Sequence, residues 1–295
     1  MAERVWRCLT LGLGMIALLG ASASYAVTLT DDRGARISLA TPPQRIVSLL
    51  PSLTETVCAL GACERLVAVD TYSNWPQAVR ALPPVGGMDD AQVESILALR
   101  PDLVLAATST RAVARLESLG LKVLTLEPRT LEDFRRVVGQ LDRALGTSAG
   151  PTLLQGVDAE LAAVATALTS AQRGTRVYFE VSSAPYAASE ASFIGQLLAR
   201  VGAANVVPGA LGPFPKLNPE FIVRADPQVV MVSDQTSGEL SARPGWSGLR
   251  ALREGRVCRF TPAQSDMLVR PGPRIAEGAR LMVACIQGRL PAGRS

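Results

Sequence analysis

The sequence predicts an α/β protein of two lobes, each a mainly parallel β-sheet flanked by helices, with one long α-helix joining the lobes and a cleft between them. Three observations lead to this prediction. A set of apolar segments occurs twice, in the same order. These segments are continuous apolar runs, which are typical of buried parallel strands. One amphipathic helix separates the two copies.

The first 26 residues have the pattern of an export signal. Arg4 and Arg7 precede an apolar run over 9–19, and small residues follow up to Ala26. A basic start, a short apolar centre and an Ala/Ser-x-Ala end are typical of a cleaved signal peptide. We therefore expect cleavage after Ala26 and an exported chain that is not inserted in the membrane; the alternative is an uncleaved anchor.

The first lobe is expected over 27–147. It opens with a hairpin over 27–40, because alternating residues flank the turn-forming 31–34. Apolar runs then predict strands in three segments, 45–52, 101–105 and 120–128.

The second lobe, over 174–295, repeats that pattern. Its expected strands lie in 176–183, 227–232 and 255–262. In both lobes a short helix with a Glu near its start ends at a Pro before the second strand. Glu94 and Glu220 therefore occupy equivalent positions.

The connecting helix is expected within 148–173. Pro151 suits the first helical turn, and leucines and valines recur at three- and four-residue steps from Leu154 to Leu168. A helix over 152–172 would span roughly 30 Å. One packed helix holds two lobes more rigidly than a Gly/Ser-rich linker would.

Four cysteines remain after the signal peptide, and an exported chain with an even number suggests disulfides. Cys58 and Cys63 lie close in sequence across a helix end, which leaves Cys258 for Cys285. Three connectivities are open, and four buried free thiols are the alternative.

Composition excludes several classes of function. The 295 residues include no His, which removes His-dependent catalysis and His-ligated metal or haem. The formal net charge of +4 is too small, and the arginines too scattered, to indicate nucleic-acid binding. Candidate carboxylate pairs for an exported enzyme are Asp31–Asp32 and Asp89–Asp90, but their contexts favour a turn and a helix start.

Several segments resemble the periplasmic binding proteins of ABC importers, in the class with a rigid connecting helix. The resemblance covers nearly the whole mature chain, and the segments that carry it are 45–55, 94–105, 212–220, 265–266 and 270–274. It implies a periplasmic, monomeric protein without a cofactor that carries a small molecule to a permease dimer with its ATPase. Within the class, the cobalamin-binding members are the most similar.

The resemblance also implies ligand-binding positions. A corrin is a broad apolar disc edged with amides, so a receptor needs aromatic faces from both lobes and polar groups at the rim. Tyr72 and Trp75 would serve in the first lobe, and Tyr186 and Phe214 in the second. Asp266 matches a family Asp that hydrogen-bonds the ligand.

The main alternative is a ferric siderophore, an anion that Arg270 and Arg274 would hold. A haem ligand is a weaker alternative, because Gly87 stands where that subfamily places a ligating Tyr.

For the permease, the resemblance implies docking through Glu94 and Glu220. Two equivalent surface carboxylates would meet the same basic pocket twice on a two-fold dimer.

Overall fold

The computed structural model describes residues 25–182, 185–233 and 240–290. Most of the predicted signal peptide lies outside these residues. Tyr25, inside that predicted segment, donates a hydrogen bond from its hydroxyl to the Arg143 carbonyl at 2.6 Å. None of the described helices is both long and apolar enough to cross a membrane.

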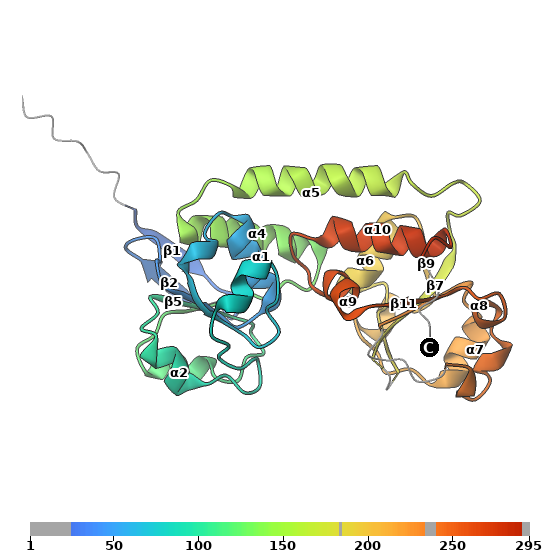
Figure 1. The fold of residues 1–295 in the computed structure, drawn as a ribbon, viewed down its shortest axis with the longest axis horizontal. Coiled ribbons are helices and arrows are strands. Elements are labelled where there is room, and N and C mark those ends of the chain that lie inside the picture. The colour runs from blue at the N-terminus through green and yellow to red at the C-terminus, as the bar shows by residue number, and fades with distance from the viewer. Residues whose placement is uncertain (1–24, 183–184, 234–239, 291–295) are drawn as a thin grey trace, which may run out of the picture.

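Two α/β lobes lie side by side under one long helix, as expected (Figure 1). The first lobe opens with an antiparallel hairpin, β1 and β2. Its main sheet is parallel, in the order β4-β3-β5-β6. The strands are β1 Val27–Thr30, β2 Arg36–Leu39, β3 Ile46–Ser48, β4 Leu66–Val69, β5 Leu103–Ala106 and β6 Val123–Thr125. The helices are α1 Pro51–Ala59, α2 Val93–Ala98, α3 Val113–Ser118 and α4 Leu131–Leu145.

The second lobe repeats the parallel order as β9-β7-β10-β11, and β8 adds an antiparallel strand beside β7. The strands are β7 Arg176–Ser182, β8 Tyr186–Ala187, β9 Ala204–Asn205, β10 Val229–Ser233 and β11 Val257–Phe260. The helices are α6 Phe193–Arg200, α7 Pro219–Ala225, α8 Arg250–Arg253, α9 Pro262–Val269 and α10 Ile275–Ile286. The matching strand orders support the internal repeat seen in the sequence.

The connecting helix is shorter than predicted. α5 covers Gly150–Ala165, with Pro151 in its first turn, so it spans about 24 Å rather than 30. The backbone leaves the helix at Thr166, whose hydroxyl donates to the Ala163 carbonyl, and the polar stretch after Leu168 forms turns. Leu168 is nevertheless buried, so the apolar periodicity identified a packed residue beyond the helix end.

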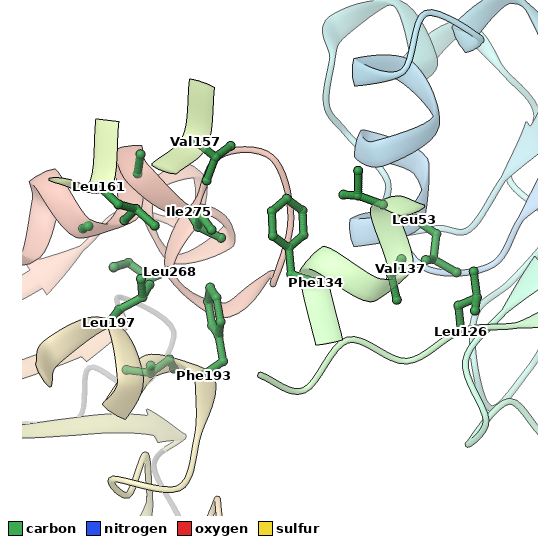
Figure 2. Packing of buried hydrophobic residues seen from close by; sticks show 14 of the residues in the cluster. Leu53, Leu126, Phe134, Val137, Val157, Leu161, Phe193, Leu197, Leu268 and Ile275 are labelled. Carbon is green, nitrogen blue, oxygen red and sulfur yellow. The ribbon is translucent and has the colours of Figure 1, made fainter. Parts of the chain in front are cut away.

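One continuous apolar core joins the lobes. Side chains of both lobes and of α5 belong to a single cluster of buried residues. Figure 2 shows Phe134 of α4 between Leu53 and Val137 on the first-lobe side and Phe193 and Ile275 on the second-lobe side. Separating the lobes would expose this large ring to water, which costs free energy because apolar area is lost from the core. This packing therefore resists wide separation of the lobes.

Both expected disulfides form. Cys58 pairs with Cys63 at the end of α1, and Cys258 of β11 pairs with Cys285 of α10. The second disulfide closes a loop of 27 residues, which stabilises the folded state by roughly 3–4 kcal/mol in the chain-entropy description.

Candidate functional site

A cavity of about 880 Å³ lies between the lobes. Its volume is that of a typical small-molecule site. The first lobe contributes segments that follow its parallel strands, and the second lobe faces them; ligands of α/β proteins commonly bind at such strand ends. The first-lobe residues are Leu50, Pro51, Ser52, Met88, Ala107, Glu127, Pro128, Arg129, Thr130 and Asp133. The second-lobe residues are Val181, Ala191, Phe193, Ile194, Pro213, Phe214, Val269, Arg270 and Pro271.

The lining of this inter-lobe cavity is mostly apolar. Three of its large apolar residues, Met88, Phe214 and Val269, are exposed to between 42 and 47%. Large apolar groups that converge on an open cavity indicate a binding surface rather than scattered surface residues. The arrangement suits a ligand with a broad apolar face.

Two of the predicted ligand-binding residues line the cavity. The Phe214 side chain, 47% exposed, stands between Pro213 and Pro215 and faces it. Arg270 also lines it, but its guanidinium is already bound to protein groups. Nη1 donates to Glu55 at 3.0 Å and to Asn74 at 2.8 Å, and Nη2 donates to the Tyr72 carbonyl at 2.9 Å.

The other four lie outside the lining. Tyr72 is 69% exposed beside Gly87, and Tyr186 of β8 is 40% exposed. The Trp75 ring is covered by the Arg274 guanidinium, whose Cζ is 4.9 Å from the ring centroid. Asp266 is an α9 residue that pairs with Arg270 at 2.9 Å. A role for these four in ligand binding stays a prediction.

Trp75 instead borders a smaller cavity of about 210 Å³. Glu55, Cys58, Ala59 and Arg274 are among its other lining residues. This cavity lies at the seam between α1 of the first lobe and the segment that precedes α10 of the second.

A buried ionic network crosses the same seam. Glu55 of α1, only 4% exposed, accepts two hydrogen bonds from Arg274, at 2.8 and 2.6 Å. Arg270 bonds to the same carboxylate, and the Asn74 amide donates to Asp266 at 2.8 Å. Two arginines and two carboxylates therefore balance in charge, and every contact but the Asp266–Arg270 pair joins one lobe to the other. Sequence reasoning missed Glu55; the one signal was a charged residue within an otherwise uncharged helix.

The loop that contains Tyr72 and Asn74 is fixed by hydrogen bonds to the buried Asp70. Asp70 is buried, accepts a hydrogen bond from the Tyr72 amide at 2.8 Å and is bonded by the Ser73 hydroxyl. Burial raises the pKa of the Asp70 carboxyl above its ordinary value, although these two hydrogen bonds and the charge of Arg270 oppose that effect.

The carboxylate pairs considered for catalysis have structural partners. Asp31 accepts hydrogen bonds from the amides of Arg33 and Ala35, as a turn residue does. Asp90 accepts one from the Gly87 amide, and Asp89 pairs with Arg111 at 3.0 Å. Within the described residues, no three Asp, Glu or Cys side chains form a group that could hold a metal ion.

The exposed carboxylates Glu94 and Glu220 lie in the first turns of α2 and α7. Figure 1 shows both helices on the side of the molecule away from α5, one on each lobe. Neither carboxylate forms an ion pair with another described residue.

The two lobes, the single helix above them and the cavity between them define a substrate-binding protein. The sequence profile of the family described as periplasmic binding protein matches residues 46–263. The chain therefore belongs to the periplasmic binding proteins.

Three similar proteins show the range of the family. An uncharacterized ABC transporter substrate-binding lipoprotein of Bacillus subtilis, YvrC, is 27% identical over 96% of both chains. A vitamin B12-binding protein of Pectobacterium carotovorum is 26% identical over 86% of this chain and 92% of its own. The periplasmic heme-binding protein RhuT from Roseiflexus has the same fold, with a TM-score of 0.73 and 26% identity over 83% of this chain and 98% of its own.

Proposed function

We propose that this protein captures cobalamin in the inter-lobe cavity and delivers it to an ABC-type inner-membrane importer. The observation that carries the proposal is the cavity itself, large and mostly apolar, with Phe214 facing it. A corrin ring presents a broad apolar face, and burying such a face against Phe214, Met88 and Val269 would supply most of the binding free energy. The vitamin B12-binding relative supports the same ligand.

The ferric siderophore is the alternative, and the ionic network weighs against binding through the two arginines expected to hold it, Arg270 and Arg274. An anionic ligand needs guanidinium groups that are free to bind it. Arg270 and Arg274 are both paired with Glu55 across the seam. Drawing either arginine to a ligand would take away one of the two guanidiniums that hold the buried Glu55 carboxylate, which is costly.

We also propose that the protein acts by binding and carries out no catalysis, and that it needs no cofactor of its own. Its aspartate pairs serve turns and ion pairs. An exported enzyme on this scaffold, the remote alternative, would need a reactive group that these side chains do not supply.

The proposed partner is the permease dimer of the importer with its ATPase. Glu94 and Glu220 would dock on it, one carboxylate from each lobe. Their place on one side of the molecule supports simultaneous contact with both halves of a two-fold partner.

The proposed location is the periplasm, with the signal peptide removed after Ala26 and the mature chain a monomer. Cleavage there would remove Tyr25 and its hydrogen bond to Arg143. The intact mass of the exported protein tests the site: it should correspond to a chain that starts at Val27 and lacks four hydrogens for two disulfides. A mass that retains Tyr25 would contradict the cleavage site.

Ligand carried through purification tests the function. Protein exported by cells grown with cyanocobalamin should retain the visible absorption of the corrinoid. Protein that is colourless after such growth, but turns brown on growth with haem, would favour the haem alternative.

A further inference from the structure

A second cavity continues the inter-lobe cavity within the first lobe. Its volume is about 370 Å³, and it shares Glu127, Arg129 and Asp133 with the larger cavity. We name it the acidic annex; its lining residues are Asp32, Thr108, Glu127, Arg129, Asp133 and Arg136. A ligand that fills the inter-lobe cavity therefore presents one edge to the annex.

The annex carries more carboxylates than guanidiniums. Arg136 is shared by two aspartates, since its Nη2 lies 3.0 Å from Asp32 and 3.1 Å from Asp133. Arg129 forms an ion pair with Glu127, with Nη2 3.2 Å from Oε2. Three carboxylates thus meet two guanidiniums, which leaves one negative charge without a partner in the lining.

The two aspartates are already committed to the fold. Asp32 also accepts a hydrogen bond from the Glu127 backbone amide at 2.8 Å. Asp133, at the start of α4, accepts one from the Thr130 hydroxyl at 2.9 Å. Burial would raise the pKa of Asp133, but hydrogen bonds from Arg136, Thr130 and the Arg129 amide outweigh burial and lower it. Asp133 is therefore a carboxylate throughout the neutral range.

Of the two carboxylates that line both cavities, Glu127 and Asp133, Glu127 has the oxygen that is open to a donor. It follows β6, and its Oε2 is bonded by the Thr108 hydroxyl and faces Arg129. Its Oε1 has no hydrogen-bond partner among the residues that the structure describes. The Arg129 side chain is largely exposed, so its ion pair with Glu127 is weak and screened.

We propose that the acidic annex selects a ligand whose edge carries neutral hydrogen-bond donors, amides above all, and rejects an edge of carboxylates, with Glu127 as the specificity-determining residue. Carboxylates on the ligand would add to the surplus negative charge, and like charges at close range lower affinity for the wrong ligand. An amide N–H would instead donate to Glu127. This inference rests on the proposed function and extends it, because a corrin edge carries amides whereas a porphyrin carries carboxylates.

The test compares cyanocobalamin with its monocarboxylic acids, in which one side-chain amide is hydrolysed to an acid. Calorimetric titration of the wild type should show at least one monoacid binding about tenfold more weakly than cyanocobalamin, as expected for one added charge near a partly solvated carboxylate. Glu127→Gln keeps the size of the side chain and the acceptor for Thr108 but removes the charge. The difference in affinity between cyanocobalamin and that monoacid should therefore shrink to about twofold. Glu132→Gln makes the same charge change at an exposed position in α4 that lines neither cavity, and the difference in affinity should persist.

The outcomes separate this inference from the proposed function. Equal binding of all corrinoids by the wild type, or an unchanged difference in affinity in Glu127→Gln, would overturn the inference and leave cobalamin as the ligand. If no corrinoid binds, the proposed function fails. The affinities for haem and for a haem derivative whose carboxylates are converted to amides are then compared. Tighter binding of the amide form would then support the inference; tighter binding of haem, or binding of neither, would overturn it as well.

Discussion

Glu55 is the buried carboxylate of the ionic network that joins the lobes. Its carboxylate is buried and receives both Arg270 and Arg274 from the other lobe. Glu55→Ala would leave the buried Arg274 guanidinium without its carboxylate partner and would remove one of the two carboxylates that pair with Arg270, so we expect it to lower the free energy of unfolding by roughly 3–5 kcal/mol. Denaturant unfolding monitored by circular dichroism measures this.

An exposed glutamate provides the control. Glu64 is near Arg65 at 3.8 Å and largely exposed, so Glu64→Ala should change stability by less than about 0.5 kcal/mol. A loss of less than about 1 kcal/mol in Glu55→Ala would show that the ionic network contributes little.

Phe214 is the predicted aromatic residue that lines the inter-lobe cavity. Phe214→Ala should weaken cyanocobalamin binding by roughly 1–3 kcal/mol, because apolar area and ring stacking are lost. Phe214→Trp should bind as well as the wild type or better, since a larger ring covers more of the corrin. Affinities come from calorimetric titration.

Leu211 gives a matched control, since it is exposed to a similar degree but lines neither cavity. Leu211→Ala should retain wild-type affinity. Unchanged affinity in Phe214→Ala would remove Phe214 from the site, and loss of siderophore binding in Arg270→Ala would favour the alternative ligand.

At the scale of the element, β4 and the loop after it connect Asp70 to the seam. Because burial raises the pKa of Asp70 in the folded state, the folded protein binds this proton more tightly than the unfolded chain. The stability that protonated Asp70 contributes is present at acid pH and is lost as pH rises through the folded-state pKa.

Asp70→Asn should therefore become more favourable relative to the wild type as pH rises from 4 to 7. Urea unfolding of both proteins at each pH gives the difference in stability. A difference that is constant with pH, or that moves in the opposite direction, would contradict the raised pKa.

The elements differ in how far the sequence predicted them. The six expected strands all form, because each is an apolar run between turn-forming residues, and burial of parallel strands demands such runs. Strand β4 was missed although Leu66–Val69 is an apolar run too, because its counterpart in the other lobe, β9, has only two residues and gives no matching apolar segment. The end of α5 was missed because apolar spacing continues to Leu168 after the backbone leaves the helix.

The site was less predictable than the fold. Aromatic residues were the available signal, and they included Phe214, which lines the inter-lobe cavity, and Trp75, which lies under the Arg274 guanidinium outside that lining. The partners of Glu55 lie in the other lobe, more than two hundred positions away. Local pattern carries no information about such a pair, so only the folded arrangement reveals it.

At the scale of the whole molecule, the internal repeat places Glu94 and Glu220 on equivalent helices of the two lobes. We expect Glu94→Ala and Glu220→Ala to leave ligand affinity unchanged while uptake falls, and to fall further in the double variant. Charge reversal to Arg should be worse, and docking of the wild type should weaken with salt. Reconstituted uptake beside a binding assay measures both; normal uptake by the folded double variant would refute the docking role.

Calorimetric titration of the purified, ligand-free protein shows whether the cavity between the lobes binds a corrinoid. Cyanocobalamin, cobinamide, haem and a ferrichrome-type siderophore are each added to separate samples. We expect saturable binding of one cyanocobalamin per chain, with much weaker binding of haem and of the siderophore. Saturable binding of haem or of the siderophore, with no heat from either corrinoid, would contradict it.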